Sequence, residues 1–182
     1  MIFRNTISLM MCELGLLALL GCEVPTTAWI ESGPTFHLGG SGRLASFTVY
    51  GPLPGHRIAT PNDEKSQVWS IQRKDFQTSL LVERMELTYG GVPDGYIQTV
   101  PPAGRPAALS TGLVYYFFAE TTGAPGAEGF FYMDKSGPIR IAVPGLCESG
   151  FVGDVKPLKC GTHESYSEPK DLEKFVQENR VR

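Results

Sequence analysis

The side chains best suited to acid–base or nucleophilic chemistry are few and widely spaced. The three histidines are His37, His56 and His163. His37 lies in the strand-like stretch TFHLGG, which favours a partly buried structural histidine, and His56 follows a Pro-Gly turn, which favours a solvated one. A catalytic nucleophile needs a base and an orienting group within reach. The sequence indicates no such set.

The carboxylates likewise predict a solvated surface rather than a catalytic pair. Asp63 and Glu64 lie in an expected turn, and Glu83 and Glu86 fall on opposite faces of an expected strand. No G-x-S-x-G, H-E-x-x-H, P-loop or EF-hand motif occurs in the sequence. We therefore expect no enzyme, no cofactor and no metal site. A concave pocket that joins a histidine to a carboxylate would reverse the first of these expectations.

Two aromatic runs, 115–118 (YYFF) and 130–132 (FFY), suggest a different chemistry. Because neighbouring side chains of a strand point to opposite faces, each run places rings on both faces of a sheet. One face forms the core. The other is either covered by another segment or exposes rings that cover a partner or stack on sugars. The candidate ligand-binding aromatics are Trp69, Tyr115, Phe117 and Phe131.

The composition is that of one globular domain. The chain has 182 residues, enough to bury a core. Hydrophobic residues make up 42% and charged residues 19%. The net charge of -3 argues against nucleic acid as a partner, because it provides no basic field.

The elements that would position these side chains are predicted to be short strands. Apolar runs rich in β-branched and aromatic residues recur about every 10–15 residues, and Gly- and Pro-rich turns separate them. This cadence predicts a mainly β fold: an antiparallel β-sandwich of immunoglobulin-like type, or a small barrel. The segment 130–143 (FFYMDKSGPIRIAV) is the strongest hairpin candidate. The run 80–89 (LLVERMELTY) has no settled period, and its neighbours favour a strand over a helix.

Residues 164–182 lack the strand pattern and predict a short C-terminal helix. Ser167 is the expected N-cap. Leu172, Phe175 and Val176 stand at i, i+3 and i+4 and form a narrow apolar stripe. We expect this stripe to dock on the sheet.

Residues 1–21 have the layout of a signal peptide, with Arg4 at the start and an apolar run over 7–20. The run is about fourteen residues long, short of the roughly 20 that a spanning helix needs. Glu13 lies within it, and a carboxylate at bilayer depth costs about 2.5–3.5 kcal/mol on insertion scales. A cleaved segment is therefore expected in place of a permanent span.

The end of this segment, Leu19-Leu20-Gly21-Cys22, resembles the lipobox of bacterial lipoprotein precursors. The resemblance implies that Cys22 becomes the mature N-terminus and carries a diacylglycerol thioether, often with a third acyl chain on its amine. Two or three chains together give stable anchoring in a lipid bilayer. In that family an Asp after the cysteine favours inner-membrane retention, so Glu23 favours the outer membrane. The alternative is a plain secretion signal with a chance cysteine.

Two further cysteines, Cys147 and Cys160, remain once Cys12 leaves with the signal and Cys22 is acylated. In the oxidising compartment that the resemblance implies, a disulfide between them is expected. It would close a loop of about 13 residues, for roughly 3 kcal/mol in the chain-entropy model. A zinc site with His163 would need an unusual ligand spacing.

The expected organisation is a signal peptide, a tether, a β domain and a C-terminal helix or tail, over residues 1–21, 22–28, 29–163 and 164–182. The expected function is a membrane-anchored envelope lipoprotein that acts as a non-catalytic interaction or structural module, with an envelope protein as its partner. The alternative is a module that binds a glycan or a small ligand. An enzyme with a dispersed site is the third class.

Overall fold

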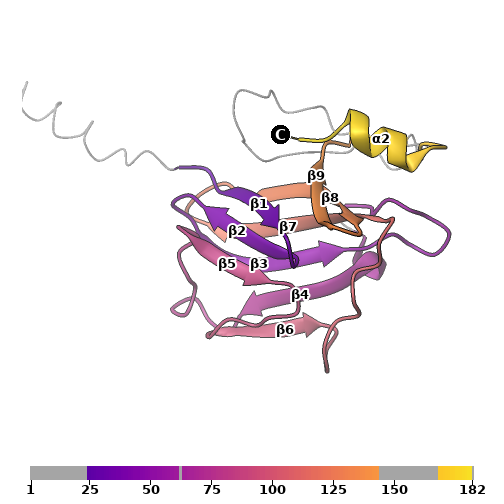
Figure 1. Ribbon diagram of the computed structural model, residues 1–182. Helices are drawn as coiled ribbons and strands as arrows, with labels where there is room; N and C mark the ends of the chain where they lie inside the picture. The colour runs from indigo at the N-terminus through magenta and orange to yellow at the C-terminus, as the bar shows by residue number, and fades with distance from the viewer. Residues whose placement is uncertain (1–23, 62, 144–167, 182) are drawn as a thin grey trace, which may run out of the picture.

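The structure is a computed structural model that describes residues 24–61, 63–143 and 168–181. Nearly all of its regular elements are strands, as the sequence predicts (Figure 1). The strands are β1 Thr27–Glu31, β2 Thr35–Gly39, β3 Arg43–Tyr50, β4 Gln67–Arg73, β5 Met85–Thr88, β6 Tyr96–Val100, β7 Val114–Thr122, β8 Ala127–Asp134 and β9 Gly137–Ile141, and the helices are the 3₁₀ helix η1 Glu64–Ser66 and the α-helix α2 Leu172–Glu178.

The strands form two antiparallel sheets. The small sheet has the order β1-β2-β5, and the large sheet has the order β6-β4-β3-β7-β8-β9. The two sheets share one hydrophobic cluster, so they pack face to face. Of the two expected architectures, the sandwich is the one observed.

The inner core lies between the sheets and is built on the two-residue period of the strands. Phe36 of the small sheet is its centre. Its ring lies 4.8 Å from that of Phe47, 5.3 Å from that of Phe117 and 5.7 Å from that of Phe131, measured between ring centroids. All four side chains are fully or almost fully buried.

The expected ligand-binding aromatics belong to this inner core. Trp69, Tyr115, Phe117 and Phe131 are all buried, so the prediction that they form an exposed binding surface is wrong. The physical reason is that the small sheet covers the face of the large sheet on which all four lie. They contribute to the packing of the inner core.

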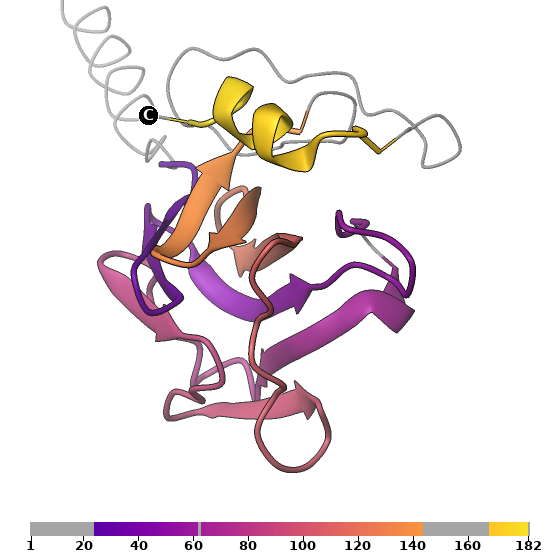
Figure 2. The ribbon, with the colours of Figure 1, turned by 45° about the vertical axis from the view of Figure 1, so that its right-hand side comes forward.

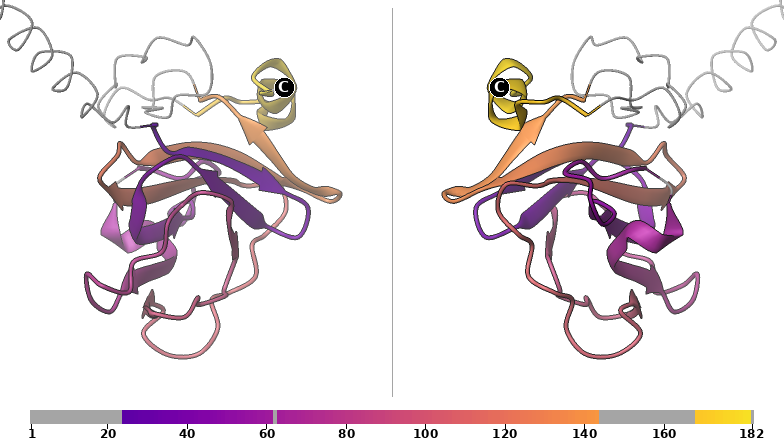
Figure 3. Two further views of the ribbon diagram at one scale, coloured as in Figure 1. Left: turned by 90° about the vertical axis from the view of Figure 1, so that its left-hand side faces the viewer. Right: turned by 90° about the vertical axis from the view of Figure 1, so that its right-hand side faces the viewer.

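An outer core covers the opposite face of β7, β8 and β9. Tyr116, Phe130 and Ile141 lie there, fully buried beneath α2 and the segment 57–60. Figures 2 and 3 show α2 beside β8 and β9. Both faces of the aromatic strands are therefore covered.

The C-terminal helix docks through the predicted stripe. Leu172 and Val176 are buried, and Phe175 packs against the same cluster. Asp171, not Ser167, caps the helix, because its carboxylate accepts the N–H of Lys174 at 3.0 Å. Ser167 lies outside the described residues.

Two further contacts fasten this segment to the sandwich. The carboxylate of Glu168 accepts the backbone N–H groups of Arg57 and Ile58 at 2.9 and 3.2 Å. Beyond the helix, Arg180 forms a β-bridge with Ile141 and so continues the ladder past the edge of β9. The segment is therefore integrated by backbone as well as by side-chain contacts.

Two of the predicted strand segments can be compared directly with the structure. The hairpin is confirmed as β8 and β9, with Gly137 at φ +127° beside the turn. The run 80–89 contributes only the short strand β5, because Arg84 adopts a left-handed φ of 58° and ends the extended backbone before it.

The chain joins the domain earlier than expected. Residues 24–28, predicted as part of the tether, belong to the domain: Val24 is hydrogen-bonded to Ser41, and β1 begins at Thr27. The expected signal peptide and the expected lipidation site Cys22 lie outside the described residues, as do both cysteines of the expected disulfide, Cys147 and Cys160.

Candidate functional site

The outward face of the small sheet carries side chains that the core does not require. Alternate residues of the sheet, such as Phe36 and Leu87, point into the inner core. The residues between them point outward and include Trp29, His37 and Glu86. The strand register aligns these three in one row across the sheet, because Trp29 is paired with His37 and His37 with Glu86.

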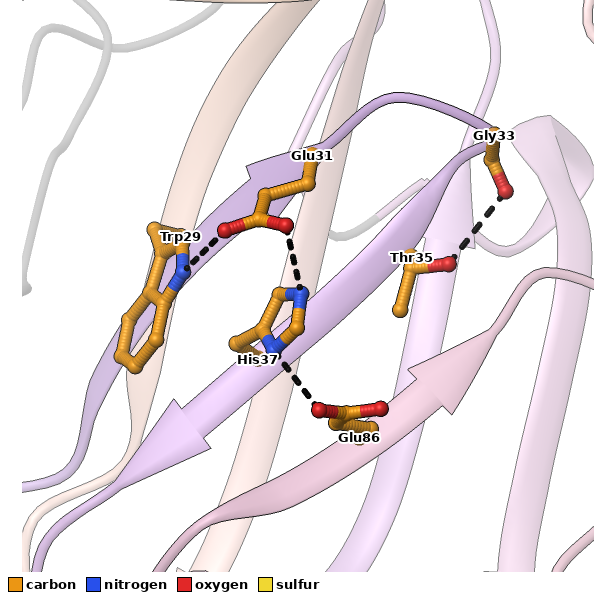
Figure 4. Close-up of polar contacts among 6 residues, drawn as sticks. All are labelled: Trp29, Glu31, Gly33, Thr35, His37 and Glu86. Atoms are coloured by element: carbon orange, nitrogen blue, oxygen red, sulfur yellow. Dashed lines mark hydrogen bonds and ion pairs between the residues drawn. The ribbon is translucent and has the colours of Figure 1, made fainter.

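Trp29 is the exposed aromatic of this row, with 43% of its surface accessible. Its ring stacks on the imidazole of His37, with centroids 5.2 Å apart and an interplanar angle of 6°. Its indole N–H donates to Glu31 Oε1 at 3.3 Å (Figure 4). Among the described strands, β1 has no hydrogen-bonded neighbour on the side away from β2. The indole is therefore fixed on its inner side and accessible elsewhere.

His37 lies between two carboxylates. Its Nε2 is 3.4 Å from Glu31 Oε2, and its Nδ1 is 3.5 Å from Glu86 Oε1 (Figure 4). Only 16% of the histidine side chain is exposed, against 60% for Glu31 and 69% for Glu86. We call Trp29, Glu31, His37 and Glu86 the Trp29 cluster.

The geometry of the Trp29 cluster suits binding better than acid–base catalysis. Each nitrogen of His37 faces a carboxylate, so neither is directed at a substrate proton. The nearby hydroxyl of Thr35 donates to the carbonyl of Gly33 at 3.4 Å rather than to His37 (Figure 4). What the cluster presents outward is an indole surface and the free lone pairs of two carboxylates.

The other expected polar residues have structural contacts. His56 is mostly exposed, as predicted, and its Nδ1 lies 3.4 Å from Glu168 Oε1. That oxygen also accepts the backbone N–H groups that fasten the C-terminal segment. Asp63 caps η1 by accepting the N–H of Lys65 at 2.9 Å. His163 lies outside the described residues.

A hollow of about 440 Å³ lies where α2 meets the large sheet. Arg57, Tyr132, Lys170, Asp171 and Glu173 are among its lining residues. It contains no histidine, and its residues include the cap of α2 and the groups that dock the helix. We interpret it as the edge of the contact between α2 and the large sheet.

Sequence reasoning placed His37 correctly but did not single out Trp29 or Glu31. A signal was available. In the stretch TAWIE, Ala28 and Ile30 share the apolar phase, which assigns the residues between and after them to the other face. What the sequence could not supply was the pairing of β1 with β2, which brings Trp29 and His37 together.

No family model, curated protein or solved structure matches the chain. In the part of the chain that the structure describes, no three residues among His, Cys, Asp and Glu are grouped so as to hold a metal ion. None of the described helices has the length and apolar character needed to cross a membrane.

Proposed function

We propose that the chain is a lipid-anchored protein of the bacterial cell envelope, that it acts as a non-catalytic interaction module, and that the Trp29 cluster is its contact surface. The observation that carries the contact surface is the row of Trp29, His37 and Glu86 on an accessible sheet face. The indole of Trp29 and the carboxylates of Glu31 and Glu86 are not needed to form the hydrophobic core.

The anchor is supported by the sequence at the start of the chain. The lipobox-like Leu19-Leu20-Gly21-Cys22 lies just before the domain, to which Val24 is already hydrogen-bonded. A diacylglycerol group on Cys22, with or without a further acyl chain, would hold the sandwich at a bilayer without crossing it.

The chemistry of the cluster favours a cationic side chain of a partner protein. A Lys or Arg placed over an indole face gains about 0.5–2 kcal/mol from the ring quadrupole. Glu31 and Glu86 flank His37 and offer charge-assisted hydrogen bonds to the same cation. Since His37 is held between them, the carboxylates are positioned before a partner arrives.

A glycan is the second candidate, and the exposure of Trp29 favours it. Sugar rings stack their C–H faces on an indole, and the carboxylates of Glu31 and Glu86 would accept hydroxyl protons. Such binding would depend on the ring and only weakly on charge or ionic strength. A cationic partner would depend on both.

The anchor is tested by radiolabelled palmitate incorporation in cells that express wild type or Cys22→Ala. We expect label on the wild type and none on the variant, because the substitution removes the sulfur that forms the thioether. Equal labelling of the two would contradict the anchor.

The contact surface is tested by fluorescence anisotropy with two labelled probes, an arginine-rich peptide and a soluble peptidoglycan fragment. A protein partner predicts binding of the peptide that weakens in Trp29→Ala and in the double variant Glu31→Gln/Glu86→Gln, and that falls with salt. Phe76→Ala and Glu83→Gln are matched controls, because both residues are exposed outside the cluster.

Preferential binding of the glycan probe, lost in Trp29→Ala but unaffected by salt, would establish the second candidate. If neither probe binds, or if the controls weaken binding as much as the cluster variants, the Trp29 cluster is not the contact surface.

A further inference from the structure

Hydrogen bonds hold the chain in place at the point where it enters the sandwich. The N–H of Val24 donates to Ser41 Oγ at 2.9 Å, and the N–H of Ser41 donates to the carbonyl of Val24 at 3.1 Å. Thr26 is fully buried, and its N–H donates to the carbonyl of Pro125 at 3.0 Å. From Val24 onward the chain is therefore held to the domain by hydrogen bonds.

This entry point lies at one end of both sheets. β1, β3, β5, β6 and β8 begin there, and β2, β4 and β7 end there, as the antiparallel registers require. It is the left-hand end in Figure 1 and faces the viewer in the left panel of Figure 3. We call it the anchor end.

The lipidation site is too close to Val24 to leave the domain free. Cys22 precedes Val24 by two residues. An extended chain spans at most about 3.3–3.6 Å per residue, so two residues reach about 7 Å. An acylated Cys22, as proposed above, would hold the anchor end at the lipid headgroups.

The anchor end also exposes large apolar side chains. Val24 is 53% exposed, Leu80 40%, Leu81 52% and Phe76 67%. Leu81 forms a β-bridge with Arg43, and the carbonyl of Leu80 accepts the N–H of Leu44 at 2.9 Å. Both leucines therefore lie beside the start of β3, just after the turn that holds Val24.

Charges at this end nearly balance. Among the described residues, the turns at this end and the strand residues next to them carry four cations and three carboxylates, namely Arg43, Arg73, Lys74, Arg84, Asp75, Glu83 and Asp94. A bilayer contact here would therefore rest on apolar insertion and would change little with salt.

We infer that the anchor end is a membrane-contact surface, on which Leu81, Leu80, Phe76 and Val24 rest against the bilayer that holds the acyl chains. This inference rests on the proposed lipidation of Cys22. It fixes an orientation, with the anchor end on the membrane and the opposite end, which carries the β8–β9 turn, away from it.

The orientation places the Trp29 cluster near the headgroups. Thr27 pairs with Gly39 at the anchor end, and Trp29 follows Thr27 by two residues. At a strand rise of about 3.3 Å per residue, the indole lies about 7 Å further along β1. The partner of the cluster would then be a molecule that itself lies at the membrane surface.

The test compares two tryptophan substitutions in the mature acylated protein, reconstituted in phosphatidylcholine vesicles with or without bromine on the acyl chains. Leu81→Trp reports the anchor end. Lys135→Trp, at the exposed β8–β9 turn, is the matched control for the opposite end. Trp29 and Trp69 contribute the same background to both, and Leu80→Trp is a second reporter.

We expect bromine to remove a larger fraction of the tryptophan emission from Leu81→Trp and Leu80→Trp than from wild type. The fraction lost from Lys135→Trp should not exceed that of wild type. These fractions should be the same at low and high salt. Equal emission loss at both ends, or none beyond wild type at either leucine, would overturn the orientation while palmitate labelling still supported the anchor. Absence of the palmitate label would overturn both.

Discussion

The two faces of the small sheet use the same three strands for different purposes. The inward residues are apolar and closely packed, and Phe36 alone contacts three other buried rings. The outward row of Trp29, His37 and Glu86 is joined by one ring stack, between Trp29 and His37, and by one 3.5 Å contact, between His37 Nδ1 and Glu86 Oε1. The comparison predicts that folding and the proposed recognition can be altered separately, because alternate residues of a strand point to opposite faces.

The largest expected effect comes from the inner face. Phe36→Ala removes a fully buried ring and leaves a cavity among its neighbours, so we expect a loss of about 3–5 kcal/mol in the free energy of unfolding. Urea denaturation followed by circular dichroism measures it. Phe76→Ala is the control: Phe76 is largely exposed, and the expected change is within about 0.5 kcal/mol. Similar losses in the two variants would remove the distinction between buried and exposed rings.

Alkaline pH is expected to act next, through tyrosines of the inner core. Burial disfavours the phenolate and raises the pKa of Tyr89 from 10.0 to about 12; burial also raises the pKa values of Tyr96 and Tyr115. The folded state therefore retains protons that the unfolded state releases. The stability that these groups contribute is complete below pH 10 and is lost as pH rises towards 12.

Urea midpoints measured at about pH 8 and about pH 11 check this expectation, together with the phenolate absorbance of the folded protein. Phe substitution at Tyr89 should reduce the alkaline loss. An unchanged midpoint at the higher pH would contradict the assigned burial of these hydroxyls.

The outer face is expected to contribute less to stability. A double-mutant cycle of Trp29→Ala and His37→Ala should give a coupling of about 0.2–1 kcal/mol, the range for cross-strand pairs. Urea denaturation of the four proteins measures it. A coupling near zero would show that the stacked rings do not hold each other in solution, and it would weaken the case for a preformed surface.

The smallest stability change is expected for Glu31→Gln and Glu86→Gln. Both carboxylates are more than half exposed, and exposed ion pairs contribute about 0–1 kcal/mol. Their unfolding midpoints should stay near wild type, while binding of the arginine-rich peptide falls. A large drop in stability would instead assign these residues to the fold.

Several features were predictable because they depend on local pattern. The β8–β9 hairpin follows from a glycine between two apolar runs, and the buried stripe of α2 follows from the spacing of Leu172 and Val176. The tether was predicted too long, because Val24 and Thr26 are held by hydrogen bonds to turns remote in the sequence. No local signal shows such contacts.

The sequence did not show which of the two tryptophans remains accessible. Trp69 and Trp29 both lie in strands, but Trp69 faces the small sheet and is fully buried, whereas Trp29 faces outward. The aromatic runs of β7 and β8 predicted one face in the core and a second face, here called the spare face, that could be covered or exposed. The outer core covers the spare face with α2 and the segment 57–60.

The sequence by itself determined the short strands and the terminal helix, because these follow from residue type and period. Only the tertiary structure decided which aromatic rings remain accessible, since burial depends on which segment packs over a face. It likewise decided that His37 meets Trp29, Glu31 and Glu86, because strand pairing joins positions that the sequence keeps apart.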